Sequence, residues 1–177
     1  MQINKQAFTL IELLVVVLII GILAAVALPQ YRVAVAKTRF SNLQTLARTY
    51  ARAAEIAKLE NGVWPRTFET LSVDVPGGST LSSANLSEDT CASNEEMYCC
   101  ITGYVSRQQY EGIYCGLLDY SLAYGWEPQF KRNVCMAANN TYLEQVCKSS
   151  GGKEHNAAGN HLIIPGGYRS GYNRYDW

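Results

Sequence analysis

The chain opens with a long apolar segment. Between Phe8 and Leu28 the only charged side chain is Glu12, and almost all the other positions are aliphatic. A helix of these 21 residues spans about 32 Å at 1.5 Å per residue, close to the thickness of a bilayer's hydrocarbon core. The pattern therefore predicts a membrane-spanning helix over residues 8–28.

Apolar positions continue past this segment at helical spacing. Pro29 lacks an N–H and Gly21 lowers helix propensity, so we expect a kink or loosening near residues 25–29. Beyond it, apolar residues three or four positions apart form one stripe: Val33, Ala36, Phe40, Leu43, Ala47, Tyr50, Ala54 and Ala57. Asn61-Gly62 is a helix stop signal. We expect one helix from about Phe8 to Glu60, with the stripe packed on the rest of the chain.

The second half of the chain favours β-strands. Residues 97–105, 112–120 and 131–137 are rich in β-branched, aromatic and cysteine residues, and their spacing predicts an antiparallel meander. A short helix is expected to start near Asn139 and Thr141 and to end at Gly151. The predicted fold class is α+β: a long N-terminal helix packed on a small antiparallel sheet.

The tail of the chain has two interpretations. Its aromatic side chains stand among glycine and arginine: Tyr168, Tyr172, Tyr175 and Trp177. They form either an exposed contact patch or a last strand laid on the sheet. Arg169 and Arg174 are too few to indicate a nucleic-acid site, and no nucleic-acid partner is expected.

The charge is distributed unevenly. The chain is formally neutral, but residues 1–60 carry a net +4 and residues 61–177 a net −4. This asymmetry is either ordinary solvated charge or an attraction between the basic stem of one copy and the acidic head of another.

Six cysteines lie in the second half: Cys91, Cys99, Cys100, Cys115, Cys135 and Cys147. An even, clustered count beyond a membrane segment favours disulfides in an oxidising compartment, and the Cys-x-x-Cys spacing of zinc sites is absent. Neighbouring Cys99 and Cys100 would point to opposite faces of a strand and have different partners. A link between Cys135 and Cys147 would close a loop of about a dozen residues. The full pairing stays open.

Glu12 needs an explanation, because a carboxylate at membrane depth is costly and usually functional. A signal peptide cut after Ala27 and a plain membrane anchor both leave Glu12 unexplained. A third interpretation starts from the stretch Ala7-Phe8-Thr9-Leu10-Ile11-Glu12-Leu13-Leu14 and the short leader before it. This stretch resembles the processing site of type IV pilins and of the related pseudopilins of type II secretion systems.

The resemblance implies a division of the chain. Residues 1–7 would be a leader, 8–28 a transmembrane and assembly helix, 29–61 an amphipathic continuation, and 62–177 a disulfide-containing head. A peptidase would cut between Ala7 and Phe8 and methylate the new amine. The family usually has glycine before the cut, and here it is Ala7. The link between Cys135 and Cys147 is similar to the disulfide-closed C-terminal loop of many pilins.

The resemblance also implies a function. Glu12 would pair with the Phe8 amine of a neighbouring copy in a filament. The expected partners are other copies, the prepilin peptidase, an assembly platform and an ATPase. The chain would wait in the inner membrane with its head in the periplasm, and then enter a surface pilus or a periplasmic pseudopilus.

Other functions stay open at this point. They are a pseudopilin, a membrane-anchored periplasmic binding module that does not polymerise, and a secreted enzyme. The chain lacks the common hydrolase, metalloprotease and phosphate-binding motifs, so no catalytic role and no cofactor are expected. Residues 151–161 offer too few carboxylates for calcium, and no metal site is expected.

Overall fold

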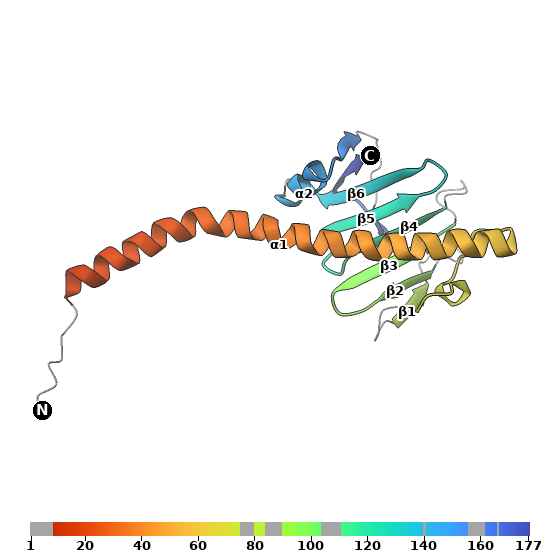
Figure 1. Cartoon of the computed structure of the whole chain (residues 1–177), viewed down its shortest axis with the longest axis horizontal. Coiled ribbons are helices and arrows are strands. Elements are labelled where there is room, and N and C mark those ends of the chain that lie inside the picture. Colours follow the sequence, from red (N-terminus) through yellow and green to blue (C-terminus); the bar gives the residue numbers. More distant parts are fainter. Residues whose placement is uncertain are drawn as a thin grey trace, which may run out of the picture.

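The computed structural model describes residues 9–74, 80–83, 90–103, 111–139, 141–155, 162–165 and 167–177. One helix, α1 (Leu10–Asn61), runs for 52 residues. Figure 1 shows its first part projecting to one side of a compact head and its second part lying across the head. The predicted α+β class is confirmed.

Helix α1 begins and ends at recognisable caps. Thr9 is the N-cap residue, and Gly62 at the other end has φ of 76°, a left-handed conformation that suits glycine. The Gly62 N–H donates to the Lys58 carbonyl at 2.8 Å, as the Asn61-Gly62 signal predicted. Pro29 lies inside the helix, which continues through it as one element. The ribbon bends in its orange part, between the projecting half and the head (Figure 1).

The head is built on an antiparallel sheet in the order β1-β2-β3-β4-β5-β6-β10-β7, with β8 and β9 forming a separate hairpin. A short turn of 3-10 helix (Phe68–Thr70) and helix α2 (Leu143–Ser149) complete the head. The strands are β1 (Thr80–Ser83), β2 (Thr90–Ser93), β3 (Met97–Thr102), β4 (Gly112–Leu117), β5 (Leu122–Glu127), β6 (Arg132–Ala138), β7 (Lys153–His155), β8 (Leu162–Ile164), β9 (Gly167–Arg169) and β10 (Tyr172–Asp176).

The three predicted strands are present as β3, β4 and β6, but sequence reasoning missed β5, which lies between β4 and β6. Its sequence breaks the usual signals, because Gly125 and Glu127 are poor strand formers. Tertiary packing explains the glycine, since a Cβ at position 125 would lie 2.3 Å from the ring of Tyr114. Residues 104 and 105, at the end of the first predicted strand, lie outside the described residues.

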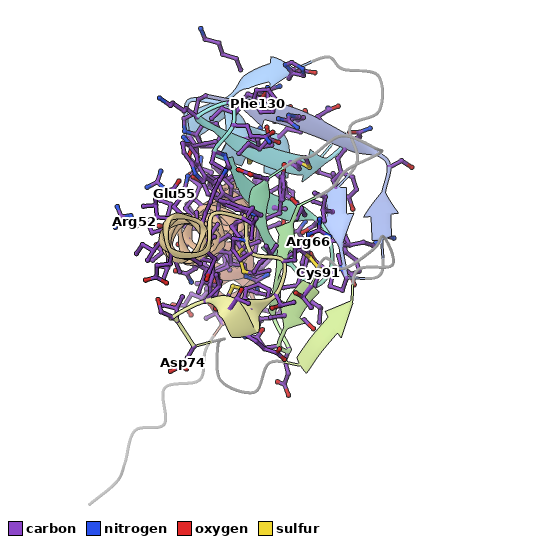
Figure 2. All side chains as sticks on the ribbon, turned by 90° about the vertical axis from the view of Figure 1, so that its right-hand side faces the viewer. Arg52, Glu55, Arg66, Asp74, Cys91 and Phe130 are labelled. Atoms are coloured by element: carbon purple, nitrogen blue, oxygen red, sulfur yellow. A yellow bond between two sulfur atoms is a disulfide. The ribbon has the colours of Figure 1, made fainter. Side chains whose placement is uncertain are left out.

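The stripe of α1 covers one face of the sheet, as predicted. Phe40 and Leu43 are at most 2% exposed, and the Phe40 ring meets Tyr124 of β5 edge-on at 5.8 Å. Alanines elsewhere in the stripe let the helix approach the sheet closely. Val33, at the start of the predicted stripe, is only half-buried. Figure 2 looks along the helix and shows it lying on one side of the sheet.

A second core lies on the other face of the sheet. Alternate residues of β3 point to opposite sides, so Cys99 and Ile101 join the core under α1, whereas Tyr98 and Cys100 join the second core. Apolar residues of the β8–β9 hairpin, including Leu162, complete this second core. Because both faces are covered, β4 is buried along its whole length and β3 at every position after Met97, and the apolar–polar alternation of a one-sided sheet is absent.

The tail forms the last strand, so the interpretation as a last strand laid on the sheet is confirmed. Strand β10 pairs with β6 on one side and β7 on the other. Tyr175 is fully buried, and the Tyr172 hydroxyl donates to the Tyr120 carbonyl at 2.6 Å. The exposed-patch interpretation is therefore wrong for these two tyrosines. Beyond β10, Trp177 exchanges backbone hydrogen bonds with Asn133.

Helix α2 starts later than expected. Its N-cap position is Tyr142, which makes no side-chain cap. The Thr141 hydroxyl instead donates to the Ala138 carbonyl at 2.6 Å, which stabilises the turn after β6.

Candidate functional site

The projecting part of α1 is the most unusual surface of the molecule. No residue from Leu10 to Val35 is buried, and the large aliphatic side chains between Leu10 and Leu28 are 45% exposed or more. By length and composition, α1 is the one helix among the described residues that could cross a membrane. A contiguous apolar surface of this size has to be covered by lipid or by protein.

Glu12 is the only charged residue of this apolar surface, and its own chain supplies hydrogen bonds to it. The backbone N–H and the hydroxyl of Thr9 donate to Oε2 of Glu12 at 2.9 and 2.7 Å. The Glu12 N–H donates to the Thr9 hydroxyl at 3.3 Å, which completes a capping box. Sequence reasoning missed this role, although Thr-x-x-Glu before an apolar run is its recognised signature. Both bonds end on Oε2, so within the described part of the chain Oε1 has room for another donor.

The other predicted residues of this helix have simple surroundings. Ala7 and Phe8, the predicted cleavage and methylation positions, lie outside the described residues. A Cβ at Gly21 would meet no atom within 4 Å, so this glycine faces open space in the single chain. Together with Pro29, it stays a predicted site of bending.

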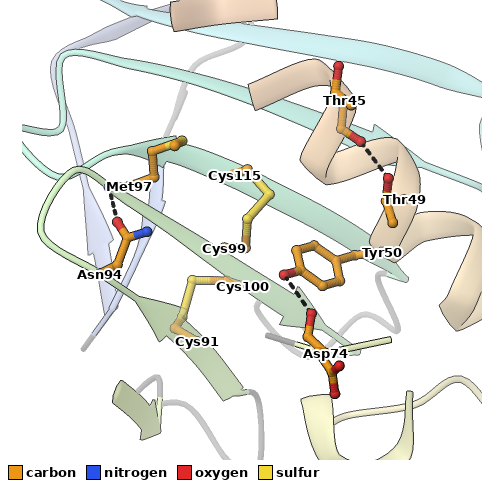
Figure 3. Close-up of a disulfide and its surroundings, with 10 residues drawn as sticks. All are labelled: Thr45, Thr49, Tyr50, Asp74, Cys91, Asn94, Met97, Cys99, Cys100 and Cys115. Atoms are coloured by element: carbon orange, nitrogen blue, oxygen red, sulfur yellow. Dashed lines mark hydrogen bonds between the residues drawn. A yellow bond between two sulfur atoms is a disulfide. The ribbon is translucent and has the colours of Figure 1, made fainter. Parts of the chain in front are cut away.

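All six cysteines form disulfides. Cys91–Cys100 joins β2 to β3, and Cys99–Cys115 joins β3 to β4 (Figure 3). Cys99 and Cys100 point to opposite faces of β3, so each bridge lies in a different core. The third bridge, Cys135–Cys147, attaches α2 to β6. The three bridges clamp the strands of the sheet and α2 to one another.

We expect the double substitution Cys135→Ser and Cys147→Ser to lower the free energy of unfolding by about 3 kcal/mol, because the bridge closes a short loop. Chemical denaturation of the full chain in detergent measures this loss. Gln145→Ala, an exposed change on the same helix, is the control and should leave the midpoint unchanged. A loss no larger than that of the control would contradict the prediction.

A buried ion cluster fixes the C-terminal strand. Glu127 of β5 is 0% exposed and accepts hydrogen bonds from the Tyr114 hydroxyl at 2.5 Å, from Arg132 Nε at 2.5 Å and from Arg174 Nη2 at 2.9 Å. Burial opposes the charge of Arg174, but the charge of Glu127 and the hydrogen bonds to Glu127 and Asp176 together outweigh it and raise the pKa of Arg174 above its usual value. Arg174 is thus a structural residue, and sequence reasoning missed its partner Glu127.

The described residues contain no cluster of three His, Cys, Asp or Glu side chains that could hold a metal ion. His155 lies 3.6 Å from Asp176 at the sheet edge, and His161 lies outside the described residues. The disulfides and the ion cluster around Glu127 join strands and α2 within the head.

Comparisons with known proteins agree with this architecture. Residues 3–28 match the family model described as "Prokaryotic N-terminal methylation motif". The chain is 37% identical over 84 residues to the type IV major pilin protein PilE of Neisseria gonorrhoeae, which covers 48% of this chain and 49% of that protein. It is 46% identical over 61 residues to fimbrial protein EcpC of Eikenella corrodens, which covers 34% of this chain and 40% of the relative.

A longer match covers the head as well. Over 152 residues the chain is 28% identical to fimbrial protein Q of Moraxella bovis, which covers 74% of this chain and 97% of that protein. The first matches thus span half or less of the relatives' length, whereas this one spans nearly all of it. No solved structure matches the chain significantly. The methylation motif, the unburied apolar half of α1 on an antiparallel head, and these relatives together make the chain similar to type IV pilins and support an assignment to their family.

Proposed function

We propose that this chain is a structural subunit of a type IV pilus-like filament that polymerises through the apolar half of α1. The observation that carries the proposal is the run Leu10–Leu28, which projects from the head without being buried by it. A membrane covers this surface before assembly, and the same surface of other copies covers it afterwards. The methylation motif and the pilin and fimbrial relatives support the proposal.

Cleavage between Ala7 and Phe8 completes the assembly site in this proposal. It leaves residues 8–28 as the assembly helix, 29–61 as its continuation and 62–177 as the head. The new Phe8 amine of one subunit pairs with Glu12 of the next. Glu12 can cap its own helix through Oε2 and receive the amine at Oε1. Such a pair fixes the register of subunits more than it adds stability, because desolvation offsets much of the Coulomb attraction.

The disulfides and the apolar helix support the proposed location. Three disulfides favour an oxidising compartment for the head, and the proposal therefore has the unassembled chain in the inner membrane with its head in the periplasm. A prepilin peptidase, an assembly platform and an ATPase supply the chemistry and the work, since the subunit itself acts as a structural part. A bend at Gly21 and Pro29 lets the helix adjust as it leaves the bilayer.

Among the alternatives, the pseudopilin is not better supported, because the relatives are named as pilins and fimbrial proteins. A membrane-anchored binding module accounts for the cap that Glu12 makes, but it does not account for the methylation motif.

Mass spectrometry of the chain purified from its native membrane and from sheared surface fibres tests the proposal. We expect a methylated Phe8 start in the fibres. An intact Met1 start in all fractions would indicate a plain anchor, and a Leu28 start would indicate a secreted product. A Phe8 start with no chain in the sheared fibres would favour the pseudopilin.

A further inference from the structure

A groove opens on one flank of α1, at the end of the head from which the apolar half projects. It has a volume of about 250 Å³. Arg39 and Asn42 of α1 form one wall, and the floor is apolar. The opposite wall carries three carboxylates, Glu95 and Glu96 from the turn between β2 and β3, and Asp119 from the turn between β4 and β5.

The groove is acidic, and Arg39 is the only cation among the described residues that line it. Among the described residues, Glu95 and Glu96 make no ion pair, and both are exposed. Asp119 uses one carboxylate oxygen to accept hydrogen bonds from Ser121. Arg39 offsets only one of the three negative charges. The apolar floor makes the groove suitable for a long side chain with an aliphatic stem and a cationic end.

Such a side chain stands on the other flank of the same helix. Lys37 is two residues before Arg39, which is a rotation of about 200° at 3.6 residues per turn. It is exposed and makes no ion pair within the described part of the chain. Along the axis it is only about 3 Å from the level of Arg39. One flank of α1 therefore carries a cation that pairs with no described residue, and the opposite flank carries the acidic groove at nearly the same height.

Copies that stand side by side in one membrane have parallel helices. When neighbouring copies are related by a rotation about an axis parallel to the helix, the groove of one copy faces Lys37 of the next. The contact therefore joins two different surfaces of the chain. Contacts of this kind extend without limit unless the rotation closes a ring. We propose that the acidic groove of Glu95, Glu96 and Asp119 is a docking site for Lys37 of a second copy.

This inference rests on the proposed function, because it names a head-proximal contact within the filament. It is independent of Glu12, which acts at the other end of the apolar helix. Electrostatic pairing of this sort sets the choice and register of neighbours more than the total affinity.

Charge reversal tests the proposal in the full chain. Lys37→Glu, and the double variant Glu95→Lys with Glu96→Lys, should each reduce sheared fibre yield by about tenfold or more, because like charges would then face each other. Combining the three changes should restore most of the yield. Arg32→Glu in place of Lys37→Glu, on the opposite flank of the helix, should give no rescue. Glu69→Lys, an exposed reversal elsewhere on the head, should leave the yield unchanged.

A zero-length carbodiimide cross-link reads the contact directly. Wild-type fibres should give a Lys37–Glu95 or Lys37–Glu96 peptide that detergent-solubilised monomers do not give. Fibres that form normally in both reversal variants, or that lack this peptide, would overturn the docking site while leaving the filament proposal intact. Absence of wild-type fibres would instead overturn the proposed function itself.

Discussion

Replacing Glu12 by glutamine is expected to reduce fibre assembly by about tenfold or more while leaving membrane insertion unchanged. Glutamine keeps the oxygen that accepts the Thr9 hydrogen bonds, because both Glu and Gln serve in a capping box. It removes the negative charge that would attract the Phe8 amine of a neighbour. The measurement is the ratio of sheared fibre to membrane-extracted chain.

Two further variants separate the roles of Glu12. Glu12→Ala loses both the cap and the charge, and should assemble no better than Glu12→Gln. Thr9→Ala loses most of the cap but keeps the charge, and should assemble much better than either. If Glu12→Gln forms fibres as well as the wild type, the carboxylate serves only as a cap and the pairing with Phe8 is wrong.

The second large effect is expected in the head. Glu127→Ala should lower the free energy of unfolding by about 3 kcal/mol, because Arg132 and Arg174 would lose their fully buried carboxylate partner and would share Asp176 in its place. The Tyr114 hydroxyl would also lose its acceptor. Strand β10 should loosen first, since Arg174 connects it to β5.

Chemical denaturation and hydrogen exchange of the full chain in detergent measure this effect. Glu154→Ala, an exposed carboxylate change on β7 next to β10, is the matched control and should cost little. Hydrogen exchange should rise in residues 172–176 of the Glu127 variant and stay unchanged in the control. Equal stability of the two variants would show that the ion cluster does not stabilise the head.

These two carboxylates show how differently the same side chain can be used. Glu12 is exposed in the single chain, and its hydrogen bonds to described residues all end on Oε2. Glu127 accepts four hydrogen bonds from three donor groups of its own head, the Tyr114 hydroxyl, Arg132 Nε and Arg174 Nη2. The first is therefore suited to a partner that arrives during assembly, and the second is suited to holding strands together.

Elements governed by local chemistry could be predicted from the sequence. The apolar run, the stripe from Ala36 to Ala57 and the stop at Gly62 are set by helical periodicity and by one glycine's access to positive φ. The three strands with β-branched and aromatic residues were found for a similar reason. The neighbouring positions of Cys99 and Cys100 also settle that these cysteines face opposite sides of a strand.

Only the tertiary structure decided the features that join residues distant in sequence. Strand β5 was missed because Gly125 and Glu127 are unfavourable until the Tyr114 ring and two arginines surround them. The sequence alone determined that one carboxylate stands in an otherwise apolar helix, because that is a property of a continuous segment. Three further features depend on which strands become neighbours: the disulfide pairing, the burial of the tail and the acidic groove beside Arg39. Strand neighbours are set by the conformational entropy lost when the loops between strands close, and this loss depends on the whole loop and not on any short segment of sequence.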